Sequence, residues 1–449
     1  MTRSETRAAL SLAAVFSLRL LGLFMIYPVF AAYAHGLIGA TPYTIGLALG
    51  IYGLSQGLLQ IPFGVLSDRV GRKPMIVVGL LMFAAGSAVA ARATTIDGVV
   101  LGRVLQGAGA VGAVILALVA DLTREENRTK AMATVGITIG LSFMIALVAG
   151  PLVAGFAGVP GIFWLMVVLS LVGIAVVLFV VPTPSDSHLR RDAETVPAMI
   201  GSVLRNRELL RFDFGIFSLH AILTASFLVI PGLLHAQLRV DGQDQWIVYL
   251  PVLLVSVAVM IPAIVVAEKR RRIKEVFVGA VGEIVVSQLL LLRADHSIAS
   301  LLVAVTLFFA AFNVLEASLP SLITKTAPPA AKGTATGIYS SSQFLGIFFG
   351  GVAGGWIHQI AHSAGVFLGS AAIALVWLLV AATMKRPSHL TMRILRIAGT
   401  GSIDERALGE RLRTVAGVAD VAVVADERLA YLKVDSRAYD AKRAQAIAG

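Results

Sequence analysis

The sequence predicts an all-α membrane protein with twelve transmembrane helices in two pseudo-symmetric six-helix halves, followed by a small C-terminal α/β domain. Composition is the first observation: 57% of the 449 residues are hydrophobic and only 14% are charged, whereas a soluble domain carries about 25% charged residues. The second is that apolar segments of about 20 residues, which cross a hydrocarbon core of roughly 30 Å, recur along the chain. The third is a change to polar composition after Arg386.

The twelve apolar segments are separated by polar loops. They begin near Ala9, Tyr43, Pro74, Asp97, Ala131 and Gly161 in the first half, and near Phe212, Trp246, Val276, Ser297, Gly333 and Gly365 in the second. The first segment runs to about Ala34, which is too long for the apolar region of a signal peptide. It also lacks a small-x-small cleavage site ahead of a soluble domain, so we expect a true span.

The basic residues predict the orientation, because cytoplasmic loops of membrane proteins are enriched in lysine and arginine. Twenty-two of them fall in loops on one side, and three, Arg92, Arg239 and Arg293, fall on the other. Both termini are therefore expected in the cytoplasm. The net charge of +11 reflects this topology, so we expect a lipid bilayer and no nucleic acid among the partners.

Several chemistries are disfavoured by what the sequence lacks. The chain has no cysteine, which excludes disulfides, thiolate metal sites and cysteine nucleophiles. It has no Walker A string, so ATP is not expected as the energy source within the chain. No nucleophile–base or metal constellation appears, so we predict neither an enzyme nor a bound cofactor.

The spans fall into two similar halves. The predicted boundaries are an N-terminal bundle at 1–182, a polar cytoplasmic linker at 183–211, a C-terminal bundle at 212–386 and a cytoplasmic domain at 387–449. The loop Ser67–Lys73 after the second span recurs loosely as Ala267–Lys274 after the eighth. Paired halves are typical of transporters that rock around a central site, although any basic loop between spans gives a similar pattern.

The C-terminal segment predicts a βαββα order, which is that of a ferredoxin-like domain without its last strand. Its predicted strands are Leu390–Ile397, Val418–Val424 and Ala430–Val434, with a turn at Asp426–Arg428. Its predicted helices run from Ser402, as the cap, to Val415 and from Tyr439 to the end.

The strongest local pattern is the loop after the second span. Its marked residues are Gly64, Asp68, Arg69, Gly71, Arg72 and Lys73. The glycines let two helices end and turn tightly, and Asp68 is placed among three cations or facing the positive N-terminus of another helix. We predict a latch that holds one conformation and yields in the other. The alternative is a basic loop that only sets the topology.

This loop resembles motif A of the major facilitator superfamily, and three further segments resemble other motifs of that family. Motif B is matched by Arg103, Gln106, Gly107 and Gly109, and motif C of the drug/proton antiporters by Gly150 and Pro151 with Gly155. The antiporters' first-span motif is matched by Leu21-Gly22 with Pro28-Val29, with Ala31 in place of the final proline. The second-half copy of motif A is degenerate, with Glu268 in place of the aspartate.

The whole chain, C-terminal domain included, resembles one bacterial inner-membrane member of that superfamily. The resemblance implies the twelve-helix fold, location in the bacterial inner membrane, and multidrug efflux by proton antiport. It also implies that motif A stabilises the outward-open state by pinning the halves together on the cytoplasmic side, and that Arg103 is linked to proton transfer.

Charges inside the spans are the next candidates, since each costs about 2.5–3.5 kcal/mol on insertion scales. Arg19 lies near mid-depth of the first span, Arg103 in the fourth, Glu283 in the ninth and Glu316 in the tenth. We predict Glu316, Arg103 and Arg19 as proton-coupling residues, with Glu316 as the carrier. The alternative is a static buried ion pair or hydrogen bond that fixes helix packing.

Uncharged polar residues in the spans either line a cavity or join helices. They are Gln56, Gln60, His220, Asn313 and Gln343. The glycine repeats Gly46-x-x-x-Gly50, Gly136-x-x-x-Gly140 and Gly346-x-x-x-Gly350-x-x-x-Gly354 predict close helix contacts.

The C-terminal domain also resembles, over Leu412–Val424, the second half of a heavy-metal-associated domain. Where such domains carry Cys-x-x-Cys, this chain has Ala398-Gly-Thr-Gly-Ser402, so thiolate binding of a soft metal is excluded. A regulatory or self-associating module and a passive appendage remain as interpretations.

We therefore predict a secondary active transporter that exports a small, amphipathic or drug-like compound in exchange for protons by alternating access. Two alternatives are kept: a transporter-like sensor, and an uncoupled facilitator regulated through the C-terminal domain.

Overall fold

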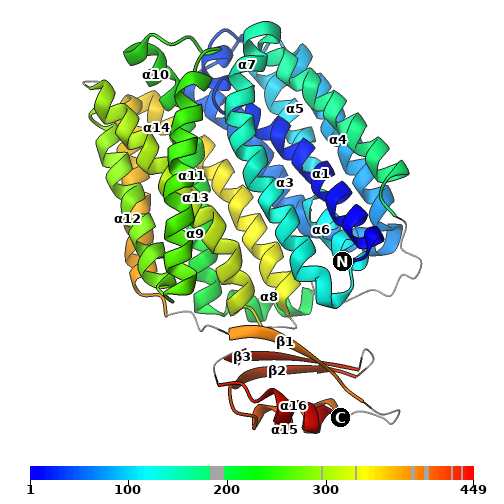
Figure 1. Cartoon of the computed structure of the whole chain (residues 1–449). Coiled ribbons are helices and arrows are strands. Elements are labelled where there is room, and N and C mark those ends of the chain that lie inside the picture. The colour runs from blue at the N-terminus through cyan, green and yellow to red at the C-terminus, as the bar shows by residue number, and fades with distance from the viewer. Residues whose placement is uncertain are drawn as a thin grey trace.

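Two bundles of helices stand side by side above a small α/β domain in the computed structural model of the chain (Figure 1). The structure describes residues 1–182, 197–294, 297–328, 331–385, 390–398, 404–425, 428–435 and 438–449. We call the side of the bundles that carries the N-terminus and the α/β domain the tail side, and the opposite side the far side (Figure 1).

The N-terminal half contains seven helical segments in the described residues. They are α1 (Arg3–Met25), α2 (Phe30–Ala34), α3 (Pro42–Val70), α4 (Arg72–Arg92), α5 (Ile96–Ala108), α6 (Gly112–Asp121) and α7 (Glu125–Phe179). The helix α7 is long enough to cross twice, because its backbone reverses at Gly158, where φ is 66°. Glycine adopts this left-handed conformation without the steric cost that a β-carbon brings.

The C-terminal half repeats this plan. Its helices are α8 (Pro197–Leu204), α9 (Arg207–Phe227), α10 (Ile230–Leu238), α11 (Trp246–Lys269), α12 (Ile273–Leu291), α13 (Ile298–Thr326) and α14 (Lys332–Ala382). The helix α14 reverses at His362, where φ is 54°. In the described residues, nine helical stretches are long and apolar enough to cross a membrane. With the two reversals and the 19-residue α12, the helices accommodate the twelve predicted crossings.

Local sequence explains where the helices begin and end. Thr41 caps α3 by accepting a hydrogen bond from the Thr44 backbone at 3.1 Å, and Pro42 follows at the first helical position, where its missing N–H costs nothing. Gly71, with a φ of 103°, separates α3 from α4. Most predicted span starts lie within a few residues of the observed ones.

The linker prediction needs a correction. Residues 183–196 lie outside the described residues, but α8 lies within the range predicted as linker, and α9 begins at Arg207 and not at Phe212. Asn206 caps α9 with its side chain by accepting from the Glu208 and Leu209 backbones. A polar first turn on an apolar helix hid this start, because composition marks the apolar core and not the helix end.

The outer surfaces of the bundles are apolar. Phe156 and Phe179 are each 79% exposed, and other large side chains on the same surfaces, such as Leu254 and Leu379, are exposed as well. A soluble protein rarely exposes contiguous apolar surface of this kind, so these side chains face lipid. This confirms the predicted all-α membrane fold.

The two halves meet backbone to backbone where α3 crosses α14. A methyl group added at Gly46 would lie 2.2 Å from the Gly351 carbonyl oxygen, and one added at Gly53 would lie 2.3 Å from that of Phe344. The Ser341 hydroxyl donates to the Gly57 carbonyl at 3.1 Å. We call this contact, from Pro42 to Gly57 on α3, the glycine seam. It occupies the far-side half of α3.

Other contacts between the halves also lie toward the far side. The Tyr27 hydroxyl lies 3.3 Å from the Thr224 hydroxyl, and the Phe143 ring stacks on Phe312 at 5.2 Å. Toward the tail side, α7 is more open: a methyl group at Gly136 or Gly140 would meet no atom within 4 Å. The predicted close contact at this glycine pair is therefore wrong for this structure, whereas the pairs on α3 and α14 are confirmed.

The tail domain is a three-stranded antiparallel sheet in the order β1-β3-β2 with two helices on the side away from the bundles (Figure 1). Its elements are β1 (Leu390–Arg396), α15 (Glu405–Arg413), β2 (Val418–Val424), β3 (Leu429–Asp435) and α16 (Ala441–Ala448). This confirms the βαββα order. The cap of α15 is Asp404, whereas the predicted cap Ser402 and two residues of the predicted turn, 426–427, lie outside the described residues.

The glycine seam generates the first prediction. Gly53→Ala places a methyl group against the Phe344 carbonyl, and overpacking of this kind costs about 1–3 kcal/mol. We expect the far side to open more often, which is measured as faster thiol labelling of a single Thr224→Cys in this chain without native cysteine.

Gly140→Ala is the matched control, because its methyl group enters open space and alanine improves helix propensity. Equal labelling rates in the Gly53→Ala and Gly140→Ala proteins would contradict the account of the seam.

Candidate transport site

Arg19 is buried inside the N-terminal half, at 3% exposure. Its guanidinium donates to the Tyr52 hydroxyl at 2.8 Å and to the Gln56 side-chain oxygen at 2.5 Å, and lies 5.4 Å from the centre of the Phe83 ring. The Gln56 amide in turn donates to Gln60 at 3.1 Å. Gln56 therefore joins α3 to α1 in the packed interior, and Gln60 on the same helix accepts from Gln56.

Arg103 is also buried, at 1% exposure, and lies over the ring of the same tyrosine, Tyr52. It donates to the Ala48 and Leu49 carbonyls at 3.2 and 3.3 Å and to Gln106 at 2.9 Å, with the Tyr52 ring centre 4.9 Å away. Among the described residues, the hydrogen-bond partners of both arginines are neutral. Their charge is thus spread over dipoles and a π face, which is favourable for guanidinium.

The glycines of the predicted motifs serve close packing. A methyl group added at Gly107 would lie 2.4 Å from the Tyr52 carbonyl oxygen, and one added at Gly109 would lie 2.2 Å from that of Gly79. One added at Gly150 would lie 2.3 Å from that of Met25. Pro151 follows inside α7. These positions fix how α5 and α7 approach their neighbours in the N-terminal half.

The predicted residues of the C-terminal half form a separate cluster around Glu316 on α13. The Gln343 amide on α14 donates to Glu316 Oε1 at 3.2 Å and lies 2.9 Å from His220 Nε2 on α9. His220 Nε2 is 3.9 Å from Glu316 Oε2. Two helices, α14 and α9, thus each contribute one side chain to the carboxylate of α13, whose side chain is 28% exposed.

Hydrogen-bond geometry assigns the protons in this cluster. His220 Nδ1 lies 3.3 Å from the Ile216 carbonyl, which only accepts, so Nδ1 carries the hydrogen. Nε2 is then free to accept from Gln343, and the second hydrogen of that amide goes to Glu316. If the Gln343 amide turned over, its oxygen would instead accept a hydrogen bond from a protonated Glu316 or a protonated His220. The favoured orientation of the amide would therefore depend on whether Glu316 and His220 carry protons.

The remaining predicted residues are not part of this hydrogen-bond network. The Asn313 amide nitrogen is buried and has no hydrogen-bond partner among the described residues. Glu283 is partly exposed on α12. Arg19 and Arg103 belong to the other half, so the structure does not bring the predicted proton-coupling set into one site.

Asp213 on α9 was missed by the sequence reasoning. It is 5% exposed, and neither of its carboxylate oxygens has a hydrogen-bond partner among the described residues. The rule that selected Glu316, a carboxylate within an apolar segment, selects this residue too. The predicted start at Phe212 had placed it at the edge of its span.

Among the described residues, the motif A loop contacts several groups of the N-terminal half. Arg72 pairs with Asp68 and donates to Ser67 and, at 3.2 Å, to Asp121 at the end of α6. Lys73 donates to the Val181 carbonyl at 2.6 Å. Gly71 forms the turn between α3 and α4, whereas Gly64 lies inside α3, so the predicted turning role holds for Gly71 and not for Gly64. Arg69 is exposed. A latch between the halves stays a prediction, and Asp121 is a partner that spacing did not indicate.

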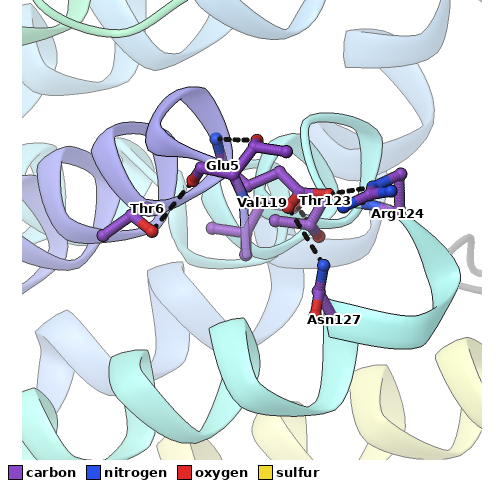
Figure 2. Close-up of polar contacts among 7 residues, drawn as sticks. Glu5, Thr6, Val119, Thr123, Arg124 and Asn127 are labelled. Carbon is purple, nitrogen blue, oxygen red and sulfur yellow. Dashed lines mark hydrogen bonds and ion pairs between the residues drawn. The ribbon is translucent and has the colours of Figure 1, made fainter.

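A second ionic cluster on the tail side joins α1 to the start of α7 (Figure 2). The buried Glu5 carboxylate accepts from the Arg124 backbone and side chain at 3.0 and 2.9 Å and from the Asn127 amide at 3.0 Å. It also accepts from the Thr2 backbone at 2.7 Å, closing a capping box. This cluster fixes the first turn of the helix that carries Gly150 and Pro151.

The tail domain contacts the C-terminal half through β3. Lys433, 8% exposed, donates to the Lys325 carbonyl at 3.2 Å and to the Ala327 carbonyl at the end of α13. A cation at a helix C-terminus is favourable because the last carbonyls lack partners. Burial, together with the charge of Lys332, lowers the pKa of Lys433, and Asp420 opposes this. The domain is thus attached to the helix that carries Glu316.

Two bundles of transmembrane helices that hold buried charges are the architecture of a membrane transporter built from paired halves. The family model of the Major Facilitator Superfamily matches residues 12–282 and 214–399, and the chain belongs to that superfamily. A second model, the YajR YAM domain, matches residues 395–441 in the tail domain. Both the predicted family and the non-enzymatic class are confirmed.

Its relatives place it more narrowly. The chain is 46% identical over 437 residues to the inner membrane transport protein YajR of Escherichia coli, covering 97% of this chain and 96% of that protein. It is 32% identical over 155 residues to the class E tetracycline resistance protein of Escherichia coli, covering 34% of this chain and 37% of that protein. A bacterial homologue of the lysosomal transporter Spinster has the same fold, with a TM-score of 0.66, 14% identity, and coverage of 85% and 96%.

The tail-domain contact generates the second prediction. Lys433→Met removes the cation that binds the last carbonyls of α13, and we expect docking to weaken by about 1–2 kcal/mol. Amide hydrogen exchange over β3 and the end of α13 should become faster. Lys442→Met, at an exposed position of α16, is the control. Unchanged exchange in the Lys433→Met protein would contradict the role of this contact.

Proposed function

We propose that this superfamily member exports a small, amphipathic compound in exchange for protons, with Glu316 as the proton-carrying group. The observation that carries the proposal is the Glu316–Gln343–His220 cluster, in which helices α13, α14 and α9 converge on one carboxylate within the membrane. A carboxylate at such a depth is costly and typically marks an ion or proton pathway.

The proposed cycle uses the two halves as rigid bodies. In this structure they are joined along the glycine seam toward the far side. We take the tail side as cytoplasmic, as the basic loops predict, so this state would open inward. Transition to the other state would separate the seam and bring the motif A loop of α3 and α4 against the C-terminal half.

Protonation would couple to this cycle through the Gln343 amide. A charged Glu316 only accepts a hydrogen bond from Gln343, whereas a protonated Glu316 can also donate one to the Gln343 oxygen once the amide turns over. In that orientation the amide no longer donates to His220. Since α14 packs both on α9 and on α3, a change at this amide acts directly on the helix of the seam.

Similarity to the tetracycline resistance protein supports a drug-like substrate, and similarity to YajR supports the inner membrane as the location. The energetics are adequate: one proton crossing 100 mV supplies about 2.3 kcal/mol, which corresponds to about a fiftyfold concentration ratio. No cofactor other than the proton is part of the proposal.

A second candidate function is a facilitator or sensor governed by the tail domain. The contact of Lys433 with the end of α13 favours it, because the domain then acts on the helix that carries Glu316. Self-association of the tail domain would be compatible with either function.

The third prediction tests the coupling. In proteoliposomes containing a pH-sensitive dye, addition of tetracycline or ethidium should drive proton movement through the native protein. Glu316→Gln should abolish proton movement and uphill transport while sparing exchange of labelled probe. Asp97→Asn, which removes an exposed carboxylate at the start of α5, is the control and should keep both.

Proton movement that survives in Glu316→Gln would contradict the assignment of the carrier. Probe transport without proton movement in the native protein would favour the facilitator. Absence of transport of both probes would contradict export of amphipathic cations and drugs of this type.

A further inference from the structure

Asp213 is a second carboxylate inside the C-terminal half that the proposed cycle does not yet use. It lies on α9, 5% exposed, and within the described residues its two oxygens have no hydrogen-bond partner. A carboxyl group in a membrane span that neither an ion pair nor a hydrogen bond holds is typical of a proton pathway.

The position of Asp213 relates it to the Glu316 cluster. Asp213 and His220 are seven residues apart on α9 and therefore share a face. On α14, Tyr339 precedes Gln343 by one turn and lies on the same face. The helices run in parallel, with Gly346 beside Phe217 and Gly350 beside Ala221. Asp213 and Tyr339 thus lie one to two turns nearer the tail side than His220 and Gln343.

Tyr339 is a third titratable group in this region of the C-terminal half. Its hydroxyl is buried and has no hydrogen-bond partner among the described residues. Glu316 and Asp213 both interact electrostatically with it. A phenol both donates and accepts a hydrogen bond, so one hydroxyl can take a proton from one carboxyl group while it gives its own to another.

We propose that Asp213 is a second proton carrier, which passes protons between Glu316 and the tail side with the Tyr339 hydroxyl as the intermediate group. This inference rests on the proposed function of Glu316. In the release step, the proton of the Glu316 carboxyl group moves to the Tyr339 oxygen as the phenolic proton moves to the Asp213 carboxylate. Asp213 then gives its proton to water on the tail side, and Tyr339 is neutral before and after.

The surroundings leave Asp213 free for this role. Glu208 and Arg211, nearer the start of α9, pair with each other. The packed helix α12 presents Phe277 to Phe212, and the sequence of α8 contains no titratable side chain. On α14, Tyr339 interacts electrostatically with Asp213 and with Glu316 of α13. Charge at Asp213 is therefore set by proton exchange and not by a fixed cation among these elements.

Infrared spectroscopy of the full-length protein in lipid tests this inference without a known substrate. The carbonyl stretch of a protonated carboxyl group is followed after a rapid change of pH. Glu316→Gln and Asp213→Asn should each remove one titrating band, which identifies the two groups. In Asp213→Asn and in Tyr339→Phe, the Glu316 band should keep its frequency but respond about a hundredfold more slowly.

Glu208→Gln, which alters the nearby ion pair, is the control and should leave the rate unchanged. The relay is overturned if the Glu316 band responds at the native rate in both variants, or if Asp213→Asn removes no band. A Glu316 that shows no titrating band at all would overturn the proposed function itself, and the two failures are thereby distinguished. Retention of the Glu316 frequency shows that each variant is folded.

Discussion

The glycine seam between α3 and α14 is the constraint on which the rest of the structure depends. Gly46, Gly53 and Gly351 bring two backbones so close that no side chain fits between them. Without a hydrophobic driving force between helices in lipid, this kind of close packing is what joins them. The seam holds the halves together on the far side, and α14 carries the contact onward to α9 through Gly346 and Gly350.

The buried charges are divided between the halves in a way that matches two different tasks. Arg19 and Arg103 donate to neutral acceptors near Tyr52, which suits a rigid interior whose groups do not change their charge. Glu316 and Asp213 are carboxyl groups with few partners, which suits groups that do. Under the proposed function, the moving proton therefore belongs to the half whose helix α14 forms the seam and packs on α9, and the half with the two arginines does not change its charge.

Sequence reasoning was sufficient where one physical signal dominates. The number of spans follows from segment length and polarity, the strand β2 follows from alternation, and the strand β3 follows from its expected pairing with β2 across the turn. It was insufficient where a partner distant in sequence decides the role of a residue. Gln56 joins α3 to α1 because Arg19 donates to it, and Arg72 binds Asp121. Asp213 was missed because a polar first turn hid the start of α9, and Glu5 because its partners lie at the start of α7.

Pulsed electron–electron double resonance, which measures the distance between two spin labels, tests the central claim. The claim is that protonation of Glu316 shifts the balance between two arrangements of the halves. The absence of native cysteine permits spin labels at Leu66→Cys and Val265→Cys on the tail side, and at Ile38→Cys and Ile247→Cys on the far side, all exposed positions. The account predicts that a change of pH moves the two pairs in opposite senses, and that Glu316→Gln fixes both in one distribution. A pH response that persists in Glu316→Gln would contradict it.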